Sequence, residues 1–360
     1  MKRYILPLTA ILLLGCETKV DKNFSELTFE ETYDIKGERV LENELSWIVD
    51  VVDDYIICKQ NSSDSLKRYL TVYDADGLEY LGSVGFRGRN LNEFQAANFF
   101  GQSYRKSDEV VIWVNDPPQY RMTAINLTAS LIEGDIEIER SIRHDPQLDF
   151  HNALFFLDDS TFAAHQPGFE LSTNQSPMVI VTNNTTMNIG QYPKLLARED
   201  VRQGERYFSV LDDVNLAMRP DQERFAAAFH YYDRLDIYSI NGDLVKSVTN
   251  PTIYKEYDAR KIFVRGKDSL VGVVSYYGQV KVTTDYIFIK YYGRERKGGD
   301  TEDVPTEIRV FDWDGNPKFV LKCTENLASF AIDEERGWLY GHDISQQRYM
   351  RYNIGEYMKD

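Results

Sequence analysis

A turn pattern that recurs six times constrains the fold of this chain more than any other feature of its sequence. At each place a strand residue, which is apolar or aromatic in five of the six, is followed by Asn or Asp. A short polar turn and a second stretch of alternating residues come next. The Asn or Asp positions are Asp74, Asn126, Asn183, Asn241, Asp312 and Asn353. They are separated by 52, 57, 58, 71 and 41 residues. Intervals of this length, with several short strands in each unit, are typical of the blades of a β-propeller.

Each unit also contains an earlier pair of strands. A first strand runs into an acidic turn, such as Asp53-Asp54 or Glu334-Glu335, and a second strand follows the turn. The second strand ends at a polar residue in every unit, namely Lys59, Asn115, His165, His230, Lys290 and His342. We therefore predict an all-β fold. In each blade an acidic turn joins strands A and B, a loop joins B and C, and the Asn or Asp turn joins C and D.

The two ends of the body are expected to meet. Little sequence follows Asn353, so the last blade has no fourth strand of its own. The segment from Leu27 to Ile35 alternates and has no neighbouring partner, and we expect it to complete that blade and cover its open edge. The prediction is one six-bladed β-propeller over residues 27–360, with its ring closed by an N-terminal strand joining the last blade. Residues 252–277 form an irregular insertion in this scheme.

The first residues have the features of a bacterial lipoprotein leader. Two basic residues precede a mostly apolar run, residues 4–14, which is too short to span a bilayer as a helix. The run leads into Leu-Leu-Gly-Cys ending at Cys16, which resembles a lipobox. That resemblance implies a signal peptide over 1–15, lipidation of Cys16 and a polar tether over 16–26. An ordinary signal peptide or a buried apolar start is the alternative.

Two stretches of the body resemble a known family. Gly85 to Phe94, GFRGRNLNEF, resembles the Gly-x-x-Gly-x-Gly-Pro-Asn-Glu-Phe stretch of TolB-like six-bladed propeller lipoproteins, with Asn-Leu in place of Gly-Pro. Phe311 to Pro317 is similar to the late Phe-Asp-x-x-Gly-x-Pro hairpin of that family. The resemblance covers residues 25–357. It implies a propeller fold and a lipidated N-terminal Cys, and it implies no particular activity.

The loops between strands B and C point to one face of the propeller. From the polar end of strand B to the turn position there are 11 residues in three blades, and the other three carry insertions of 4, 7 and 11 residues. Insertions confined to one face are a common mark of a binding face. We expect the six polar residues to form a ring at the channel mouth that attracts an anionic or sugar-like ligand. The alternative to ligand binding is a structural one, in which these residues are polar because strand ends are exposed to solvent.

Composition and missing motifs narrow the classes of function. The formal charge of −16 argues against nucleic acid as a partner. The sequence has none of the motifs of serine hydrolases, zinc proteases or nucleotide-binding loops. We expect no metal and no cofactor, because His165, His230 and His342 would lie on different blades. Cys58 and Cys323 also fall on different blades, which predicts free thiols.

These observations favour a lipoprotein that binds without catalysis. We expect it to be lipid-anchored in the bacterial cell envelope, at the outer membrane, and to face either the periplasm or the outside. Its partner would be an envelope protein, a glycan or a peptide. The alternative is a propeller enzyme, a hydrolase or lyase acting on a carbohydrate or lactone, which would need carboxylates or a metal inside the channel. A purely structural part of an envelope complex is a third possibility.

Overall fold

The computed structural model describes most of the region that the sequence assigns to the propeller. The described ranges are 27–41, 46–60, 68–90, 92–144, 153–165, 176–182, 185–192, 213–249, 274–295 and 304–359. The predicted signal peptide and tether, Cys16, the turn position Asn183 and most of the predicted insertion at 252–277 therefore lie outside the described residues.

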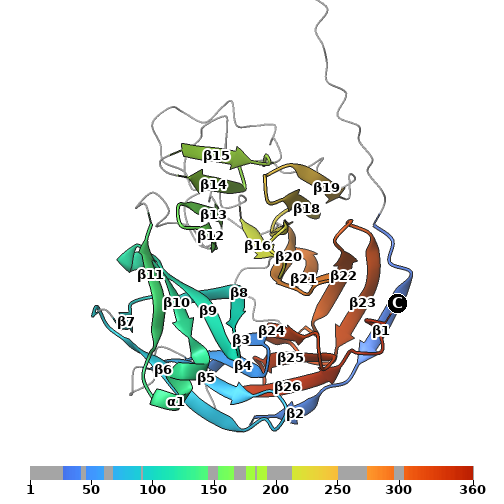
Figure 1. Cartoon of the computed structure of the whole chain (residues 1–360). Helices are drawn as coiled ribbons and strands as arrows, with labels where there is room; N and C mark the ends of the chain where they lie inside the picture. Colours follow the sequence, from blue (N-terminus) through green and yellow to red (C-terminus); the bar gives the residue numbers. More distant parts are fainter. Residues whose placement is uncertain are drawn as a thin grey trace, which may run out of the picture.

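The described strands form six sheets arranged in a ring, as predicted (Figure 1). Blade 1 contains β3 (Ser46–Val52), β4 (Tyr55–Gln60), β5 (Arg68–Asp74), β6 (Tyr80–Arg87) and the short β7 (Glu93–Phe94). Blade 2 contains β8 (Asn98–Lys106), β9 (Glu109–Asp116), β10 (Arg121–Asn126) and β11 (Ile138–Arg143), with the 3-10 helix η1 (Pro117–Gln119) and the helix α1 (Leu127–Glu133) between its strands. Blade 3 contains β12 (Leu154–Asp158), β13 (Thr161–His165), β14 (Met178–Thr182) and β15 (Thr185–Ile189).

The second half of the ring follows the same order. Blade 4 contains β16 (Val214–Met218), β17 (Arg224–Phe229), β18 (Arg234–Ser239) and β19 (Leu244–Thr249). Blade 5 contains β20 (Val274–Val282), β21 (Tyr286–Glu295), β22 (Glu307–Asp312) and β23 (Pro317–Cys323), and β1 (Glu31–Ile35) lies at its outer edge. Blade 6 contains β24 (Leu327–Asp333), β25 (Trp338–Asp343), β26 (Arg348–Asn353) and β2 (Glu38–Val40).

An N-terminal strand closes the ring, but it is a different segment from the predicted one. β2 pairs antiparallel with β26, so that Val40 lies opposite Tyr349. β1, which is the second half of the alternating stretch, pairs in parallel with β23 on blade 5. The prediction that Leu27 to Ile35 completes the last blade is therefore wrong. The three residues of β2 are too few to show a period-2 pattern, so the sequence favours the longer β1.

The Asn and Asp positions shape the turns through their own side chains. Asp312 Oδ1 accepts hydrogen bonds from the backbone N–H groups of Asp314 and Asn316, at 3.0 and 2.8 Å. In blade 2 the same position begins a helix instead, because Asn126 Oδ1 caps the N–H of Ala129 at 2.9 Å. Short polar side chains suit both roles, since they can accept from the backbone two to four residues ahead.

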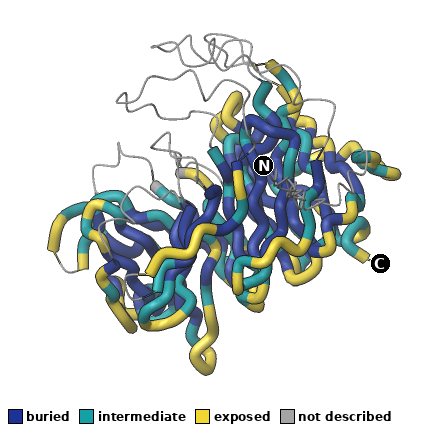
Figure 2. The backbone as a smooth tube through the Cα atoms, turned by 90° about the horizontal axis from the view of Figure 1, so that it is seen from above, coloured by how far each residue is buried: buried dark blue, intermediate teal, exposed yellow. Residues whose placement is uncertain are grey.

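The core of the propeller lies between the blades. Among the described residues, buried apolar side chains form six clusters, and each cluster joins one blade to the next. Alternation along each strand sends one set of side chains to the preceding blade and the other set to the following blade. Buried residues accordingly fill the middle of the blades, and exposed residues gather at the turns (Figure 2). No helix in the described ranges is long and apolar enough to cross a membrane.

Candidate functional site

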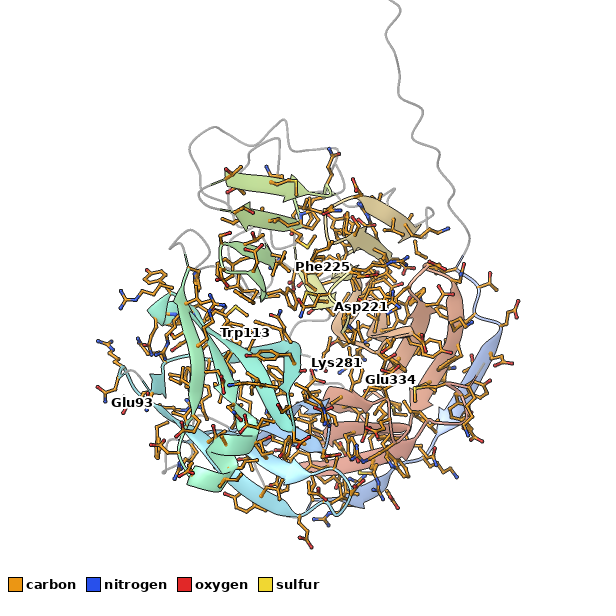
Figure 3. All side chains as sticks on the ribbon, in the orientation of Figure 1. Glu93, Trp113, Asp221, Phe225, Lys281 and Glu334 are labelled. Carbon is orange, nitrogen blue, oxygen red and sulfur yellow. The ribbon has the colours of Figure 1, made fainter. Side chains whose placement is uncertain are left out.

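A cavity of about 650 Å³ occupies the central channel. Its walls are the inner strands β3, β8, β16, β20 and β24, together with Ala153, which precedes β12. The turns between strands A and B also contribute to it, through Asp53, Gln222, Glu334 and Glu335. Lys281 and Glu334 lie near the centre of the ring in Figure 3. A volume of this size is within the range of small-molecule sites, about 300–1,000 Å³.

An ion pair joins two blades across the cavity wall. Lys281 on β20 of blade 5 donates to Asp50 Oδ2 on β3 of blade 1 at 2.8 Å, and also to the carbonyl of Val49. Blade 6 lies between these two blades, so the lysine side chain extends past its inner strand. Both side chains are largely buried, with 11% and 13% of their surfaces exposed.

Irregularities in the inner strands place Asp50. The pairing of β3 with β4 shifts between Ile48 and Asp50, and a bulge of this kind turns a side chain towards a new direction. Gly101 lies in a similar irregularity of β8 with φ +84°, and a Cβ there would be 2.8 Å from Asp50 Oδ2. Glycine at this position therefore makes room for the carboxylate.

Two glutamines on inner strands hold the neighbouring blade by its backbone. Gln102 on β8 donates to the carbonyl of Phe156 at 2.5 Å and accepts from its N–H at 2.9 Å. Gln279 on β20 does the same to Phe330, at 3.1 and 2.9 Å. Because each amide satisfies both backbone groups, these contacts fix the inner strands that form the cavity wall.

The acidic turns lie at one mouth of the cavity. Arg336, on the turn of blade 6, contacts Asp54 and Asp76 of blade 1 at 2.5 Å and Asp333 at 3.5 Å. Arg105 of blade 2 contacts Asp53 of blade 1 at 3.0 Å. Asp333 lines the cavity and is buried, and this burial raises the pKa of its carboxyl in spite of Arg336.

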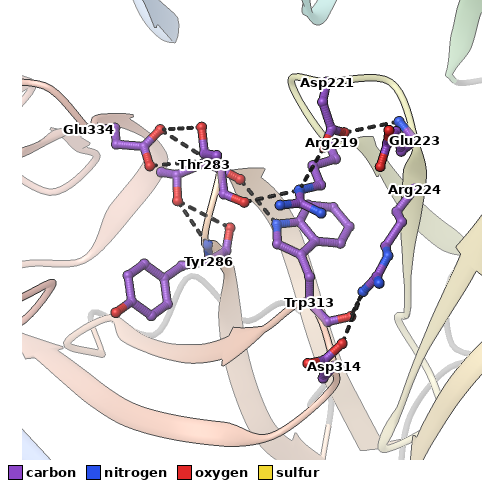
Figure 4. Close-up of polar contacts among 10 residues, drawn as sticks. Arg219, Asp221, Glu223, Arg224, Thr283, Tyr286, Trp313, Asp314 and Glu334 are labelled. Carbon is purple, nitrogen blue, oxygen red and sulfur yellow. Dashed lines mark hydrogen bonds and ion pairs between the residues drawn. The ribbon is translucent and has the colours of Figure 1, made fainter. Parts of the chain in front are cut away.

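A second set of polar contacts continues around the same mouth (Figure 4). Glu334 of blade 6 accepts from the N–H and hydroxyl of Thr284 on blade 5, at 3.0 and 3.2 Å. The carbonyl of Thr284 accepts from Arg219 Nε of blade 4 at 3.0 Å. Trp313 Nε1 donates to the carbonyl of Thr283 at 3.1 Å, and its own carbonyl accepts from Arg224. Blades 4, 5 and 6 are thus tied together beside the cavity.

The six polar residues at the ends of the second strands lie at one register, each facing the following blade. Lys59 Nζ donates to Asn98 Oδ1 at 3.0 Å, at the start of the inner strand of blade 2. His230 Nδ1 lies 2.8 Å from the carbonyl of Tyr277 on the inner strand of blade 5. Lys290 donates to the carbonyl of Leu327. Burial lowers the pKa of Lys290 to about 8.

Two members of this set reach the segment that connects their own blade to the next. Asn115 Oδ1 is 3.3 Å from His144 Nε2, and His165 Nε2 is 3.4 Å from the hydroxyl of Tyr192. Five of the six residues therefore make contacts at the junctions between blades, and none of the six lines the cavity. Their predicted part in ligand binding stays a prediction.

His342 differs from the other five. Its ring is buried, and neither ring nitrogen has a hydrogen-bond partner among the described residues. Blade 2 provides Asn98 for Lys59, and Asn98 pairs in register with Asn115 as Trp47 pairs with Lys59. Trp47 thus occupies in blade 1 the position that Asn98 occupies in blade 2. Its indole has an N–H donor and no acceptor, so it offers no acceptor to a ring N–H of His342. Burial lowers the pKa of His342.

Among the described residues Cys58 and Cys323 form no disulfide, in agreement with the sequence analysis, and both are buried, on blades 1 and 5. Burial raises the pKa of Cys323 well above its usual value, which disfavours the reactive thiolate. Within the described ranges there is no group of three or more His, Cys, Asp or Glu that could hold a metal ion.

Sequence reasoning located the acidic turns but missed the groups inside the channel. Asp50 and Lys281 are 231 residues apart in the chain, and neither belongs to a motif. Asp50 is the one charged residue in the apolar run of residues 47–52, and no local feature shows which distant side chain it meets. Only the meeting of blades 5 and 1 around the channel brings the pair together.

The chain was compared with known families and structures. The model of the TolB-like 6-blade propeller-like family matches residues 45–335. No curated protein matches the chain. A solved DUF4221-family structure from Bacteroides vulgatus shares the fold, with a TM-score of 0.54 at 13% identity, over 91% of this chain and 97% of that chain. A Bacteroides fragilis structure whose name describes an exported protein is similar with a TM-score of 0.48 at 11% identity, over 91% and 98%.

Proposed function

The chain belongs to the TolB-like six-bladed propeller family, and from that premise we propose that it is a non-catalytic binding module of the bacterial cell envelope. Its ligand would be a glycan, a peptide or a segment of a partner protein. The observation that carries the proposal is the polar cavity of about 650 Å³ in the channel. Concave sites with a few placed polar groups are the usual location of ligand binding.

The walls of the cavity support a binding role because they are held in place before any ligand arrives. The Lys281–Asp50 pair and the glutamine contacts of Gln102 and Gln279 each fix one inner strand against another. A site that is already ordered loses little conformational entropy when a ligand binds.

The membrane anchor is the second part of the proposal. The lipobox-like sequence supports lipidation of Cys16, and several acyl chains would hold the protein durably at the outer membrane. Growth with an alkyne-labelled fatty acid tests this step. The wild-type protein should take up label and sediment with membranes, whereas Cys16→Ala should do neither. Labelling of Cys16→Ala would contradict the proposed anchor.

One observation favours the enzyme alternative. Asp333 lines the cavity, and its raised pKa is a property that general acids require. The same carboxylate accepts from the backbone N–H of Arg336 at 3.0 Å, which is a turn contact that needs no catalytic role. Turnover of a carbohydrate or lactone that disappears in Asp333→Asn would replace the binding proposal with the enzyme.

Blocking the cavity tests the binding proposal directly. Ser103 lines the cavity and is partly exposed, so Ser103→Trp would fill the space. Ile132 on α1 is 76% exposed and outside the cavity, which makes Ile132→Trp a matched control. We expect wild-type protein carrying Cys16→Ser to bind a member of a glycan and peptide array, Ser103→Trp to lose it and Ile132→Trp to retain it. Unchanged binding by folded Ser103→Trp would exclude the cavity as the site.

A further inference from the structure

The cavity mouth at the acidic turns carries more negative charge than its neighbours neutralise. Arg105, Arg219 and Arg336 are guanidinium groups there. Arg219 pairs with Asp221, and the other two interact with the carboxylates Asp53, Asp54, Asp76, Asp333 and Glu335. Glu334 and Glu335 are exposed and line the cavity. Within the described ranges neither of these two glutamates has a cation at ion-pair distance.

The cavity wall already binds an alkylammonium group, and that group belongs to the chain itself. The ammonium of Lys281 is held by a carboxylate oxygen of Asp50 and by the carbonyl of Val49. A carboxylate and a carbonyl on neighbouring residues of an inner strand are thus sufficient to hold a primary amine in this channel. Asp333 and Glu334 end the inner strand of blade 6, beside the same part of the cavity.

The opposite ends of the blades carry charges of both signs, since the ion-paired carboxylates Asp116 and Asp343 lie there together with two largely buried lysines. Lys59 and Lys290 lie at the other ends of the blades, and in the described part of the chain neither has a carboxylate at ion-pair distance. Arg87 lowers the pKa of Lys59 and Arg294 lowers that of Lys290, in addition to the effect of burial. The acidic turns, where Glu334 and Glu335 line the cavity, are therefore the mouth at which a cation is attracted.

We propose that the cavity binds a small cationic ligand bearing alkylammonium groups, which enters between the acidic turns of blades 1 and 6. The contacts would be made by Glu334 and Glu335 at the mouth and by Asp53 at the adjoining turn. This inference rests on the proposed function, because it takes the cavity as the ligand site and adds the chemical class of the ligand. Low-dielectric walls strengthen the attraction of such a cleft for a cation.

Calorimetric titration with 1,5-diaminopentane, spermidine and the uncharged 1,5-pentanediol tests the proposal on the whole chain carrying Cys16→Ser. The two amines should bind and the diol should not, and amine affinity should fall as salt is raised. Glu334→Gln with Glu335→Gln should weaken amine binding about tenfold. Asp108→Asn with Glu133→Gln removes the same charge from exposed positions outside the cavity and should have no such effect.

Three results would overturn the cationic ligand. These are equal binding of the diol and the diamine, an unchanged amine affinity in the double glutamine variant, and an unchanged amine affinity in folded Ser103→Trp. The proposed function fails by a different result, namely binding of an array ligand that is unchanged in folded Ser103→Trp. If an uncharged array ligand binds and Ser103→Trp loses it while the amines do not bind, the cavity remains the site and only the charge class is wrong.

Discussion

His342 on β25 and Ser329 on β24 lie opposite each other in register, both buried, and in the part of the chain that the structure describes neither side chain has a hydrogen-bond partner. They lie in blade 6, which meets blade 1 where the two ends of the propeller come together. Unpaired polar groups in a folded core cost about 1–3 kcal/mol each. The closing interface of the ring therefore carries an unsatisfied pair, whereas each of the other five strand-end residues makes at least one polar contact.

We expect acidification to weaken the fold through His342. Burial lowers its pKa in the folded chain, so the unfolded chain takes up the proton more readily. The carboxylate of Asp343 opposes this shift, but burial outweighs it. The stability that comes from the neutral ring is complete above the unfolded pKa of about 6.5 and is lost as pH falls through the lower folded pKa. Urea midpoints between pH 8 and 5 should fall less in His342→Gln than in the wild type.

The matched control for His342 is Ser329→Ala. This change removes the opposite unpaired group without removing a titrating one, so the pH dependence should stay that of the wild type. The stability of Ser329→Ala at pH 8 should be equal or slightly higher, because an unsatisfied buried hydroxyl is lost. Parallel pH profiles for the wild type and His342→Gln would show that another group controls the acid response.

The Lys281–Asp50 pair should be a coupled unit in stability. Removing one partner leaves the other as a largely buried charge with no opposite charge beside it, which costs about 3 kcal/mol. Lys281→Met and Asp50→Asn should each lower the free energy of unfolding by roughly this amount. The double variant should lose much less than the sum, since neither charge remains. Urea denaturation of all four proteins measures the coupling, and additive losses would mean that the pair contributes little.

Local sequence patterns predict much of the fold, but they do not predict much of the site. Asp312 signals its turn because its side chain bonds to the backbone a few residues ahead, an interaction that needs no distant partner. β2 cannot be predicted in the same way, because its three residues are a strand only through their pairing with β26. Asn126 shows the limit even of local chemistry, since one capping side chain serves a turn or a helix.

The polar residues at the ends of the second strands illustrate the same division. Their common register follows from the repeat, and the structure places all six facing the next blade. Whether such a residue faces a ligand or a blade junction depends on what the neighbouring blade provides, as Asn98 does for Lys59 and Leu327 for Lys290. The residues that decide this belong to a different part of the sequence, and they meet the strand end only in the folded ring.

Gly101 should be essential for the geometry of the channel wall. Its φ of +84° already disfavours any other residue, and a Cβ would lie 2.8 Å from Asp50 Oδ2. Gly134 ends α1 with φ +73° and has nothing within 4 Å of such a Cβ. Gly134→Ala should therefore cost about 1 kcal/mol from backbone strain alone, and Gly101→Ala should cost about 2–3 kcal/mol. Equal losses in thermal unfolding would show that the wall adjusts freely.

Lys290 predicts a response to alkaline pH. Burial lowers its pKa to about 8 in the folded chain, whereas an exposed lysine titrates near 10.4. Between these values the unfolded chain binds the proton and the folded chain does not, so stability should rise with pH from about 8 to 10.4. Lys290→Met should abolish this rise, although it leaves the carbonyl of Leu327 without its donor. The control Lys322→Met changes an exposed lysine on β23 and should retain the rise in urea midpoint. If Lys290→Met shows the wild-type profile, the ammonium of Lys290 is solvated and its contact with blade 6 is not the cause.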